Sequence, residues 1–232
     1  MLLLLGLTSG SPASAPALGA HGRRASGSCH PPRHRQARLR TARLVVWKVY
    51  RYSRYTDEGE VPATASYYAC LRPDGRTHLL LQTEQSLLVG EQITALTASG
   101  TIVGATRSWG VKQGGDEEVL VRDAASGRRY AVKVYQYTNP ASEDPPAPAL
   151  ERLGTPVGLG AHELTVDSRG DAAWVGLTSA GTPASQSVLY VRDRSGLRRV
   201  AVEPSIDHLR LVGGSLRWRS GGAERFAALS PE

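Results

Sequence analysis

Histidine and cysteine near the N-terminus are the first residues whose types could bind a metal. His21, Cys29, His30 and His34 lie close together in the chain, and thiolate and imidazole are common ligands of zinc and copper. The surrounding segment has no hydrophobic periodicity that would fix a coordination geometry. Cys29 also has an alternative partner in Cys70, which is the only other cysteine. We therefore predict no metal site and no cofactor.

Acidic residues give the second set of candidates. Asp57, Glu58 and Glu60 fall on an expected loop, and a pair of carboxylates is the basic equipment of glycoside hydrolysis. Asp207 and His208 form an acid–histidine pair at the start of an expected strand. A solvated loop explains the first group and a surface hydrogen bond explains the second. We predict no catalytic residue from either group.

Three sequence signatures of enzymes are incomplete or missing. His162 and Glu163 begin a pattern found in zinc proteases, but Val166 stands where the second histidine would be. The chain has no Gly-x-Ser-x-Gly elbow for a nucleophilic serine. It also has no glycine-rich loop ending in Lys-Ser or Lys-Thr that would hold a phosphate. These observations favour a protein that is not an enzyme.

A hairpin pattern that occurs more than once indicates which elements carry these residues. An apolar run ending in Arg122-Asp123 leads through Gly127 into a second apolar run, and the run ending in Arg192-Asp193 does the same through Gly196. Such a pattern is typical of strand–turn–strand units. We expect the two aspartates to cap the turns with their carboxylates and the two glycines to relieve backbone strain there.

The same kind of pattern extends along the chain and predicts an all-β fold. About fourteen strands are expected, with a turn every 8–12 residues, starting from the apolar run Leu44–Tyr50. Larger units recur about every 45–50 residues, which is the size of a four-stranded propeller blade. Trp174 and Trp218 lie in apolar strands of two of these units and are expected to be structural. The Pro-rich stretch 137–159 is expected to be an exposed loop.

At these residues the chain resembles β-propeller repeat proteins of the TolB-like and WD-repeat kind. Blades of such proteins carry an apolar strand, an Asp, a Ser/Thr-Gly turn and another apolar strand. WD-repeat blades usually have Trp before the Asp, where this chain has Arg122 and Arg192. The strand Tyr67-Tyr-Ala-Cys-Leu71 and the ending Gly213-Gly-Ser-Leu-Arg-Trp218 also resemble uncharacterised exported proteins of GC-rich actinobacteria, which share these motifs and a cysteine-containing leader. The resemblance implies a propeller-like array of about four four-stranded blades, and it transfers no active site. Two packed β-sandwiches are the alternative fold for the same pattern of strands.

The sequence predicts that the protein is exported from the cytoplasm. Residues 1–20 contain a short apolar run followed by small residues, which is typical of a signal peptide. Residues 21–43 are expected to be a disordered Arg-rich arm, and residues 44–232 a single β-repeat domain. In an oxidising compartment two cysteines favour a disulfide between Cys29 and Cys70, whereas two free thiols would indicate a cytosolic protein.

The charge distribution limits the kind of partner. Seven of the 28 basic residues lie in the first 43 residues, and the remaining chain has 21 basic and 21 acidic residues. The folded part therefore has no net basic field for nucleic acid. The arm lacks the aromatic residues that stack on bases, and we expect from it at most a weak contact with anionic polymers. No apolar stretch is long enough for a transmembrane helix.

These patterns together predict an exported, monomeric, non-catalytic binding or structural module of the cell envelope. The expected partner is a protein, peptide or glycan bound through the loops, with Trp109, Tyr137 and the stretch 137–159 as the candidate surface. The alternative is a carbohydrate-active or other hydrolase with its site in the mouth of the propeller.

Overall fold

The computed structural model of the protein describes residues 29, 31–32, 35, 37–57, 59–72, 74–86, 90–111, 114–138, 161, 163–177 and 186–230. These residues form strands and turns, and none of them is in a helix. The prediction of an all-β fold is therefore confirmed. These residues therefore include no helix that is long and apolar enough to cross a bilayer.

In the described part of the chain, seventeen strands form four antiparallel sheets, and neighbouring strands in the three larger sheets mostly follow one another in the chain. The eight-stranded sheet contains, in spatial order, β1 (Ala37–Arg40), β2 (Leu44–Arg51), β5 (Ala63–Leu71), β6 (Thr77–Gln85), β7 (Gly90–Ser99), β8 (Ile102–Val111), β9 (Gly114–Asp123) and β10 (Arg129–Thr138). The four-stranded sheet contains β11 (Glu163–Val166), β12 (Ala172–Leu177), β13 (Ser187–Asp193) and β14 (Gly196–Glu203). The three-stranded sheet contains β15 (Asp207–Val212), β16 (Ser215–Ser220) and β17 (Ala223–Ala228), and β3 (Arg54–Thr56) pairs with β4 (Gly59–Val61) as a separate hairpin.

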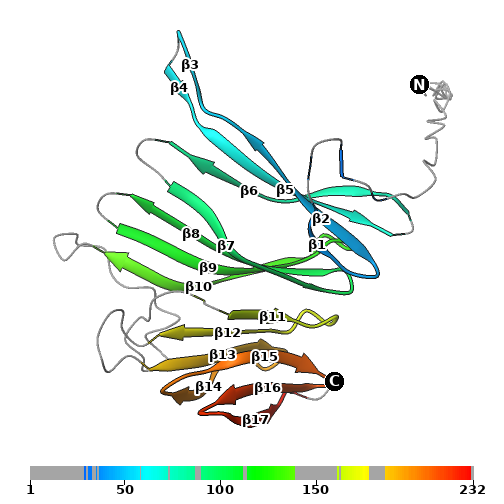
Figure 1. Ribbon diagram of the computed structural model, residues 1–232, viewed down its shortest axis with the longest axis vertical. Helices are drawn as coiled ribbons and strands as arrows, with labels where there is room; N and C mark the ends of the chain where they lie inside the picture. The colour runs from blue at the N-terminus through cyan, green and yellow to red at the C-terminus, as the bar shows by residue number, and fades with distance from the viewer. Residues whose placement is uncertain are drawn as a thin grey trace, which may run out of the picture.

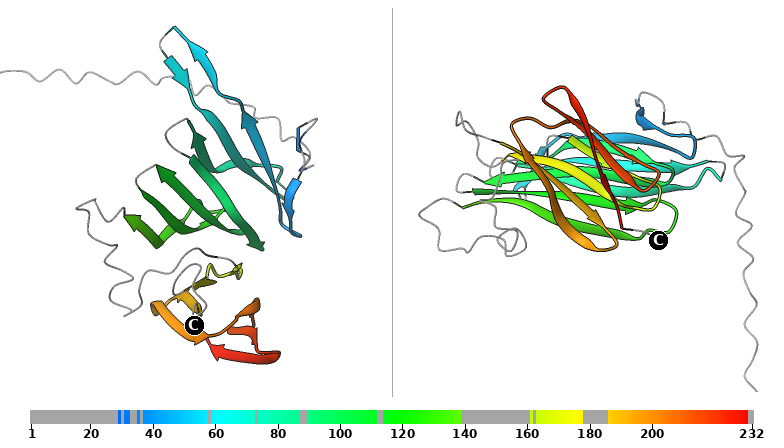
Figure 2. Two further views of the ribbon diagram at one scale, coloured as in Figure 1. Left: turned by 60° about the vertical axis from the view of Figure 1, so that its left-hand side comes forward. Right: turned by 90° about the horizontal axis from the view of Figure 1, so that it is seen from below.

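The eight-stranded sheet bends sharply in its middle. Strands β6 and β7 are joined by the single pair Gln85 and Gly90, so the two halves splay apart, as the left view of Figure 2 shows. A cluster of apolar side chains that includes Leu44, Leu80 and Val103 packs between the halves. The sheet therefore behaves as two four-stranded layers, β1-β2-β5-β6 and β7–β10.

The four-stranded sheet lies in the middle of a stack of layers (Figure 1). One face, with Trp174 and Tyr190, packs against β8–β10, and the other, with Val175 and Leu189, packs against the three-stranded sheet. Burial on both faces explains why β12 and β13 are continuous apolar runs without the alternation of a surface strand. None of the sheets closes on itself among the described residues.

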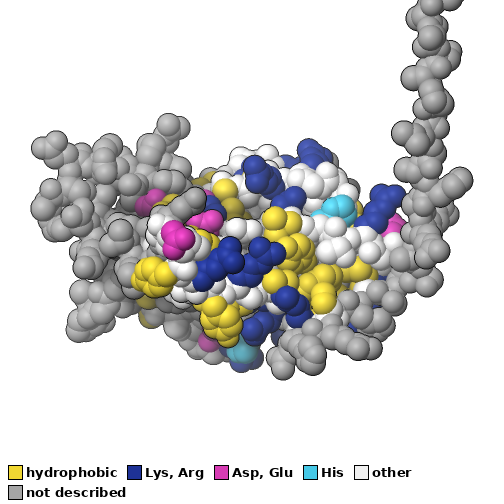
Figure 3. Space-filling model, turned by 90° about the horizontal axis from the view of Figure 1, so that it is seen from above, with side chains coloured by type: hydrophobic (Ala, Val, Ile, Leu, Met, Phe, Trp, Pro, Cys, Tyr) yellow, Lys and Arg dark blue, Asp and Glu magenta, His cyan; other side chains and the backbone are white. Residues whose placement is uncertain are grey.

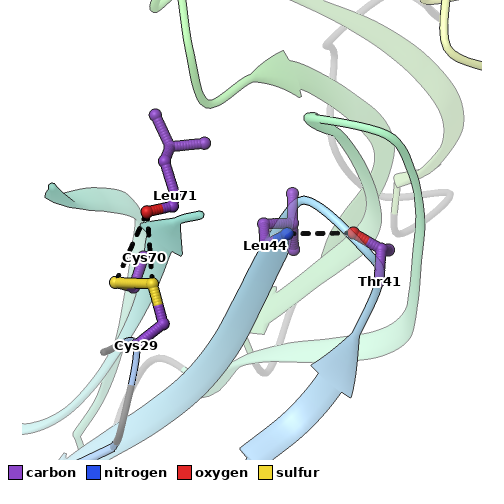
Figure 4. The surroundings of a disulfide bond; sticks show 5 residues. All are labelled: Cys29, Thr41, Leu44, Cys70 and Leu71. Carbon is purple, nitrogen blue, oxygen red and sulfur yellow. Dashed lines mark hydrogen bonds between the residues drawn. A yellow bond between two sulfur atoms is a disulfide. The ribbon is translucent and has the colours of Figure 1, made fainter. Parts of the chain in front are cut away.

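The N-terminal end of the stack is covered by a disulfide, as predicted. Cys29 is bonded to Cys70 of β5, with a Cα–Cα distance of 5.5 Å (Figure 4). Both cysteines are buried against Val45 and Trp47, on the face of β2 that points away from the rest of the stack. The disulfide thus holds Cys29 over an apolar surface that no further sheet of the described residues covers.

The folded part begins earlier than the expected boundary at residue 44. Strand β1 lies inside the segment 21–43 that was expected to be a disordered arm, and it pairs with β2. Leu39 packs against the first apolar cluster, while Arg38 and Arg40 on either side of it are exposed. This short alternation is masked in the sequence by the surrounding arginines. The run Leu44–Tyr50 becomes β2 and lies between β1 and β5 in the first layer.

The two Arg-Asp hairpins form β9–β10 and β13–β14, the third and fourth strands of their layers. The Asp123 carboxylate accepts hydrogen bonds from Ala125 N and Ser126 Oγ at the turn. Asp193 accepts one from Ser195 N. Gly127 and Gly196 have φ angles of 75° and 104°, a region that residues with a Cβ rarely enter.

Asp193 also ties its turn to the C-terminal end of the described chain. Its carboxylate is almost fully buried and pairs with Arg198 and with the backbone N–H of Ser230. Burial acts to raise the pKa of Asp193, but the hydrogen bonds from Arg198, Ser230 and Ser195 outweigh it, so the pKa lies below its usual value. Because the folded-state pKa is below the unfolded one, the carboxylate stabilises the fold above about pH 4. This contribution is lost as the pH falls through the folded-state pKa.

We expect the substitution Asp193→Asn to lower the free energy of unfolding at pH 7 by about 2 kcal/mol, since it removes a charged hydrogen-bond acceptor from a buried position. It should also reduce the loss of stability on acidification below pH 4. Urea unfolding followed by circular dichroism between pH 2.5 and 7 measures both effects. Asp207→Asn is the matched control, because Asp207 is half exposed and its one ion-pair partner among the described residues is His208, at 3.9 Å. Equal effects of the two substitutions would contradict the conclusion that the buried Asp193 carboxylate stabilises the fold.

Candidate ligand-binding groove

A groove lies between the two halves of the eight-stranded sheet, where β6 separates from β8–β10. It encloses about 610 Å³, which is within the usual range for small-molecule sites. Its apolar lining comes from both walls: Leu79, Leu80 and Leu81 on β6, and Val103, Ala105, Leu120 and Ala131 on β8–β10. The groove exists because the ladder between β6 and β7 is reduced to one pair at one end.

A β-bulge shapes the β6 wall of the groove. Tyr67 pairs with Leu81 and Tyr68 with Leu79, so Leu80 is the extra residue. An extra residue in a bulge is left outside the ladder. The carbonyl of Leu80 accepts a hydrogen bond of 2.6 Å from Arg122 Nη1. Arg122 of β9 therefore spans the groove and joins its two walls.

The arginine of the second Arg-Asp hairpin makes a comparable contact in the next layer. Arg192 of β13 lies over the ring of Tyr130 of β10, with 3.7 Å between the guanidinium carbon and the ring centroid. Each arginine thus contacts the last strand of the preceding layer. In WD-repeat blades the position of these two arginines is usually a tryptophan. From the sequence alone, Arg122 and Arg192 were interpreted only as a difference from the WD-repeat motif, and no role was predicted for them.

Arg122 also faces a second arginine. Arg129 is its direct partner in the β9–β10 ladder, so both side chains lie on the groove face. Neither forms an ion pair with a carboxylate of the described residues. Like charges directly opposite each other on neighbouring strands are destabilising. This pair is therefore an unfavourable arrangement that a bound anion would relieve.

Further along the groove a third arginine is already neutralised. Arg107 of β8 pairs with Glu118 of β9 and lies 2.9 Å from Glu91 of β7. Its guanidinium also lies 5.2 Å from the centre of the Trp109 ring. Among the groove-lining residues Glu118 is the one carboxylate. The buried Nε–H groups of Arg107 and Arg122 have no acceptor among the described residues, so this wall is rich in donors.

The two residues expected to form a binding surface lie near each other along the sheet, but at consecutive register positions, which do not share a face. Trp109 pairs with Asp116, and Tyr137 pairs with Gly115 at the same end of β9. Trp109 lies on the groove side of β8, two residues from Arg107. The stretch 139–160, which includes most of the expected loop, lies outside the described residues, as does the side chain of Tyr137.

The other candidate residues do not assemble into a site. Asp57 is an exposed turn residue between β3 and β4, and His208 Nε2 lies 3.9 Å from Asp207 Oδ1 on the surface. No group of three potential metal ligands occurs in the described part of the chain. His21, His30, His34, His162, Glu58 and the side chain of Glu60 lie outside that part. Trp174 and Trp218 are buried in the core between layers.

A second exposed surface was not anticipated from the sequence. The β3–β4 hairpin projects from one end of the molecule (Figure 1); Tyr55 on β3 is 73% exposed, and Tyr52, which precedes β3, is 83% exposed. Figure 3 views the molecule from this end and shows hydrophobic side chains next to grouped Lys and Arg. Exposed Tyr with Arg is the composition of a contact surface.

Comparison with known proteins gives no relative for this chain: no protein-family model, curated protein or solved structure matches it. The geometry of the groove is therefore the basis for a function.

Proposed function

We propose that this protein is a non-catalytic binding module whose groove between β6 and β8–β10 holds an anionic amphiphile, that is, an apolar chain ending in a carboxylate or phosphate group. The observation that carries the proposal is the like-charged pair of Arg122 and Arg129 beside a leucine-lined wall. An apolar chain fits the leucines, and the anionic group fits the arginines.

The electrostatics of the groove favour an anion over a cation or a neutral ligand. Arg107 is balanced by Glu91 and Glu118, which leaves the charges of Arg122 and Arg129 for a ligand. Arginine presents several N–H donors in a fixed fork that matches carboxylate and phosphate oxygens. The apolar walls lower the local dielectric and strengthen such a contact.

The same features argue against the hydrolase alternative. Hydrolysis of a glycosidic bond needs two carboxylates that flank the bond, and the described lining of the groove contributes Glu118 alone. Glu118 is paired with Arg107, so it is held as a counter-ion. A role in ligand binding needs no further group.

Decyl phosphate is a suitable probe, since it combines one apolar chain with one anionic group. We expect isothermal titration calorimetry with the full chain, at probe concentrations below micelle formation, to show saturable binding. Decanol and dodecyltrimethylammonium should bind at least tenfold more weakly, which corresponds to about 1.4 kcal/mol. Equal binding of all three probes, or no binding of decyl phosphate, would overturn the proposal.

Paired variants locate the binding site. Arg129→Gln should weaken the binding of decyl phosphate about tenfold. Arg128→Gln changes the exposed residue next to it and should leave this binding unchanged. Leu79→Ser should weaken binding by removing an apolar contact, and Val202→Ser is its control, since Val202 is similarly exposed on a different sheet. If each control behaved like its partner, the groove would not be the site.

We also propose that the protein is exported and that its layers are related to propeller blades. The disulfide is consistent with an extracellular location. The Arg-Asp hairpins occupy equivalent third and fourth positions in two successive layers, which supports a repeat origin. Mass spectrometry of the protein from its native host would test export, because cleavage after Ala20 predicts a mature chain that starts at His21.

A further inference from the structure

The three-stranded sheet has an outer face that no other segment of the described structure covers. Its inner face, with Leu216 and Trp218, packs on the four-stranded sheet. Residues that pair directly in an antiparallel ladder share a face, so Arg210, Arg217 and Phe226 lie together on the outer face. All three are exposed.

The outer face contains one like-charged pair, whereas its third arginine, Arg219, is directly opposite Asp207 and Glu224. Arg210 of β15 is directly opposite Arg217 of β16, which repeats the like-charged pair of the groove. Neither arginine has an ion-pair partner among the described residues. With Arg219 and His208 they line a shallow hollow of about 320 Å³, in which Glu224 is the one carboxylate. The hollow therefore carries a net positive charge.

The backbone beside the hollow is strained. His208 has a φ of 56° and is the one non-glycine residue with positive φ in the described chain. It lies within a register shift between Asp207 and Arg210. Strained residues and bulges are frequent near functional sites, where they change the direction of a side chain. Here the side chain of His208 remains 62% exposed at the rim of the hollow.

Exposed apolar side chains accompany the arginines. Phe226 is 80% exposed and Val212 is 54% exposed, and both lie on the outer face by their pairing. The last layer of a stacked protein needs a polar outer face for solubility, which the arginines alone would supply. An exposed phenylalanine does not contribute to solubility. Cations next to exposed apolar side chains are typical of surfaces that bind to the interface of an anionic membrane.

We propose that the outer face of β15–β17 binds the surface of an anionic phospholipid membrane. The arginines contact the lipid phosphates, and Phe226 and Val212 enter the region below the headgroups. This surface is on a different sheet from the groove, so the proposal does not depend on the ligand of the groove.

Co-sedimentation of the full chain with vesicles tests the proposal. We expect binding to vesicles of 70% phosphatidylcholine and 30% phosphatidylglycerol, at least tenfold weaker binding to phosphatidylcholine alone, and a decrease with added salt. The double variant Arg210→Gln/Arg217→Gln should weaken binding about tenfold or more. It should fold normally, since it removes a repulsion.

Three single variants show whether vesicles bind at this face. Arg225→Gln removes the same charge from the same edge strand as Phe226 but from the opposite face, and it should leave vesicle binding unchanged. Phe226→Ser should weaken binding even at high salt. Arg129→Gln should retain vesicle binding, which separates this surface from the groove. A loss of vesicle binding in Arg225→Gln as large as in the double variant Arg210→Gln/Arg217→Gln would overturn the proposal, as would binding of soluble tripolyphosphate without any binding of vesicles.

Discussion

Replacing Gly104 with alanine is expected to lower the free energy of unfolding by about 3 kcal/mol, which is large for the addition of one methyl group. Gly104 lies in β8 where the eight-stranded sheet meets β11. A Cβ placed on it would lie 2.6 Å from Val166 Cγ1 and 3.1 Å from Thr97 Cγ2. Val166 is buried, and its β-branched side chain has little freedom to turn away. The layers would have to move apart.

A double-mutant cycle separates this steric effect from other causes. Val166→Ala alone should destabilise the fold by about 1–2 kcal/mol because it leaves a small cavity. The double variant Gly104→Ala/Val166→Ala should be destabilised by less than the sum of the two single substitutions, since the added methyl group then fills the space that the valine side chain vacates. Gly90→Ala is the control, because a Cβ there meets nothing within 4 Å. Urea unfolding followed by circular dichroism gives all four values. Strict additivity would show that the two side chains do not meet.

The importance of Gly104 illustrates what the sequence could not reveal. In the sequence Gly104 follows Val103 in an apolar run and resembles any glycine in a strand. Its role depends on Val166, which lies more than sixty residues away in the next layer. Contacts between layers depend on register and on the distance between sheets, and neither is encoded in local periodicity.

Local signals, in contrast, predicted the strands well. Asp123 with Gly127 and Asp193 with Gly196 marked two hairpins that the structure contains, because a carboxylate and a residue with positive φ are enough to define a turn. The disulfide followed from the presence of only two cysteines. The splaying of the first sheet was not predicted, since it results from a ladder that is reduced to one pair between β6 and β7.

The candidate site was predicted only at its edge. Trp109 was expected to contribute to a binding surface, and it lies beside Arg107 at one end of the groove. Arg122 and Arg129 were not recognised, although the Arg-Asp hairpin was. Their opposition across β9 and β10 follows from the pairing register, and a charged pair facing a cavity cannot be inferred until the cavity is known.

The substitution Trp174→Ala is expected to have the largest effect on stability, about 3–5 kcal/mol. Trp174 is 1% exposed and stacks on Tyr190, with 5.8 Å between the ring centroids. It fills the space between the four-stranded sheet and strands β8–β10. Truncation to alanine would leave a cavity in the middle of the stack, where layers on both sides prevent β12 from moving inwards.

Two further tryptophan variants show whether the layers depend on this side chain. Trp109→Ala makes the same chemical change at a partly exposed position and should cost no more than about 1 kcal/mol. Trp174→Phe keeps an aromatic ring against Tyr190 and removes an indole N–H that has no acceptor among the described residues. Because an unpaired buried donor is itself unfavourable, this variant should recover most of the stability lost in Trp174→Ala. The urea concentration at the midpoint of unfolding measures these effects. If Trp174→Ala and Trp109→Ala lowered this midpoint equally, packing between the layers would not be what holds the four-stranded sheet in place.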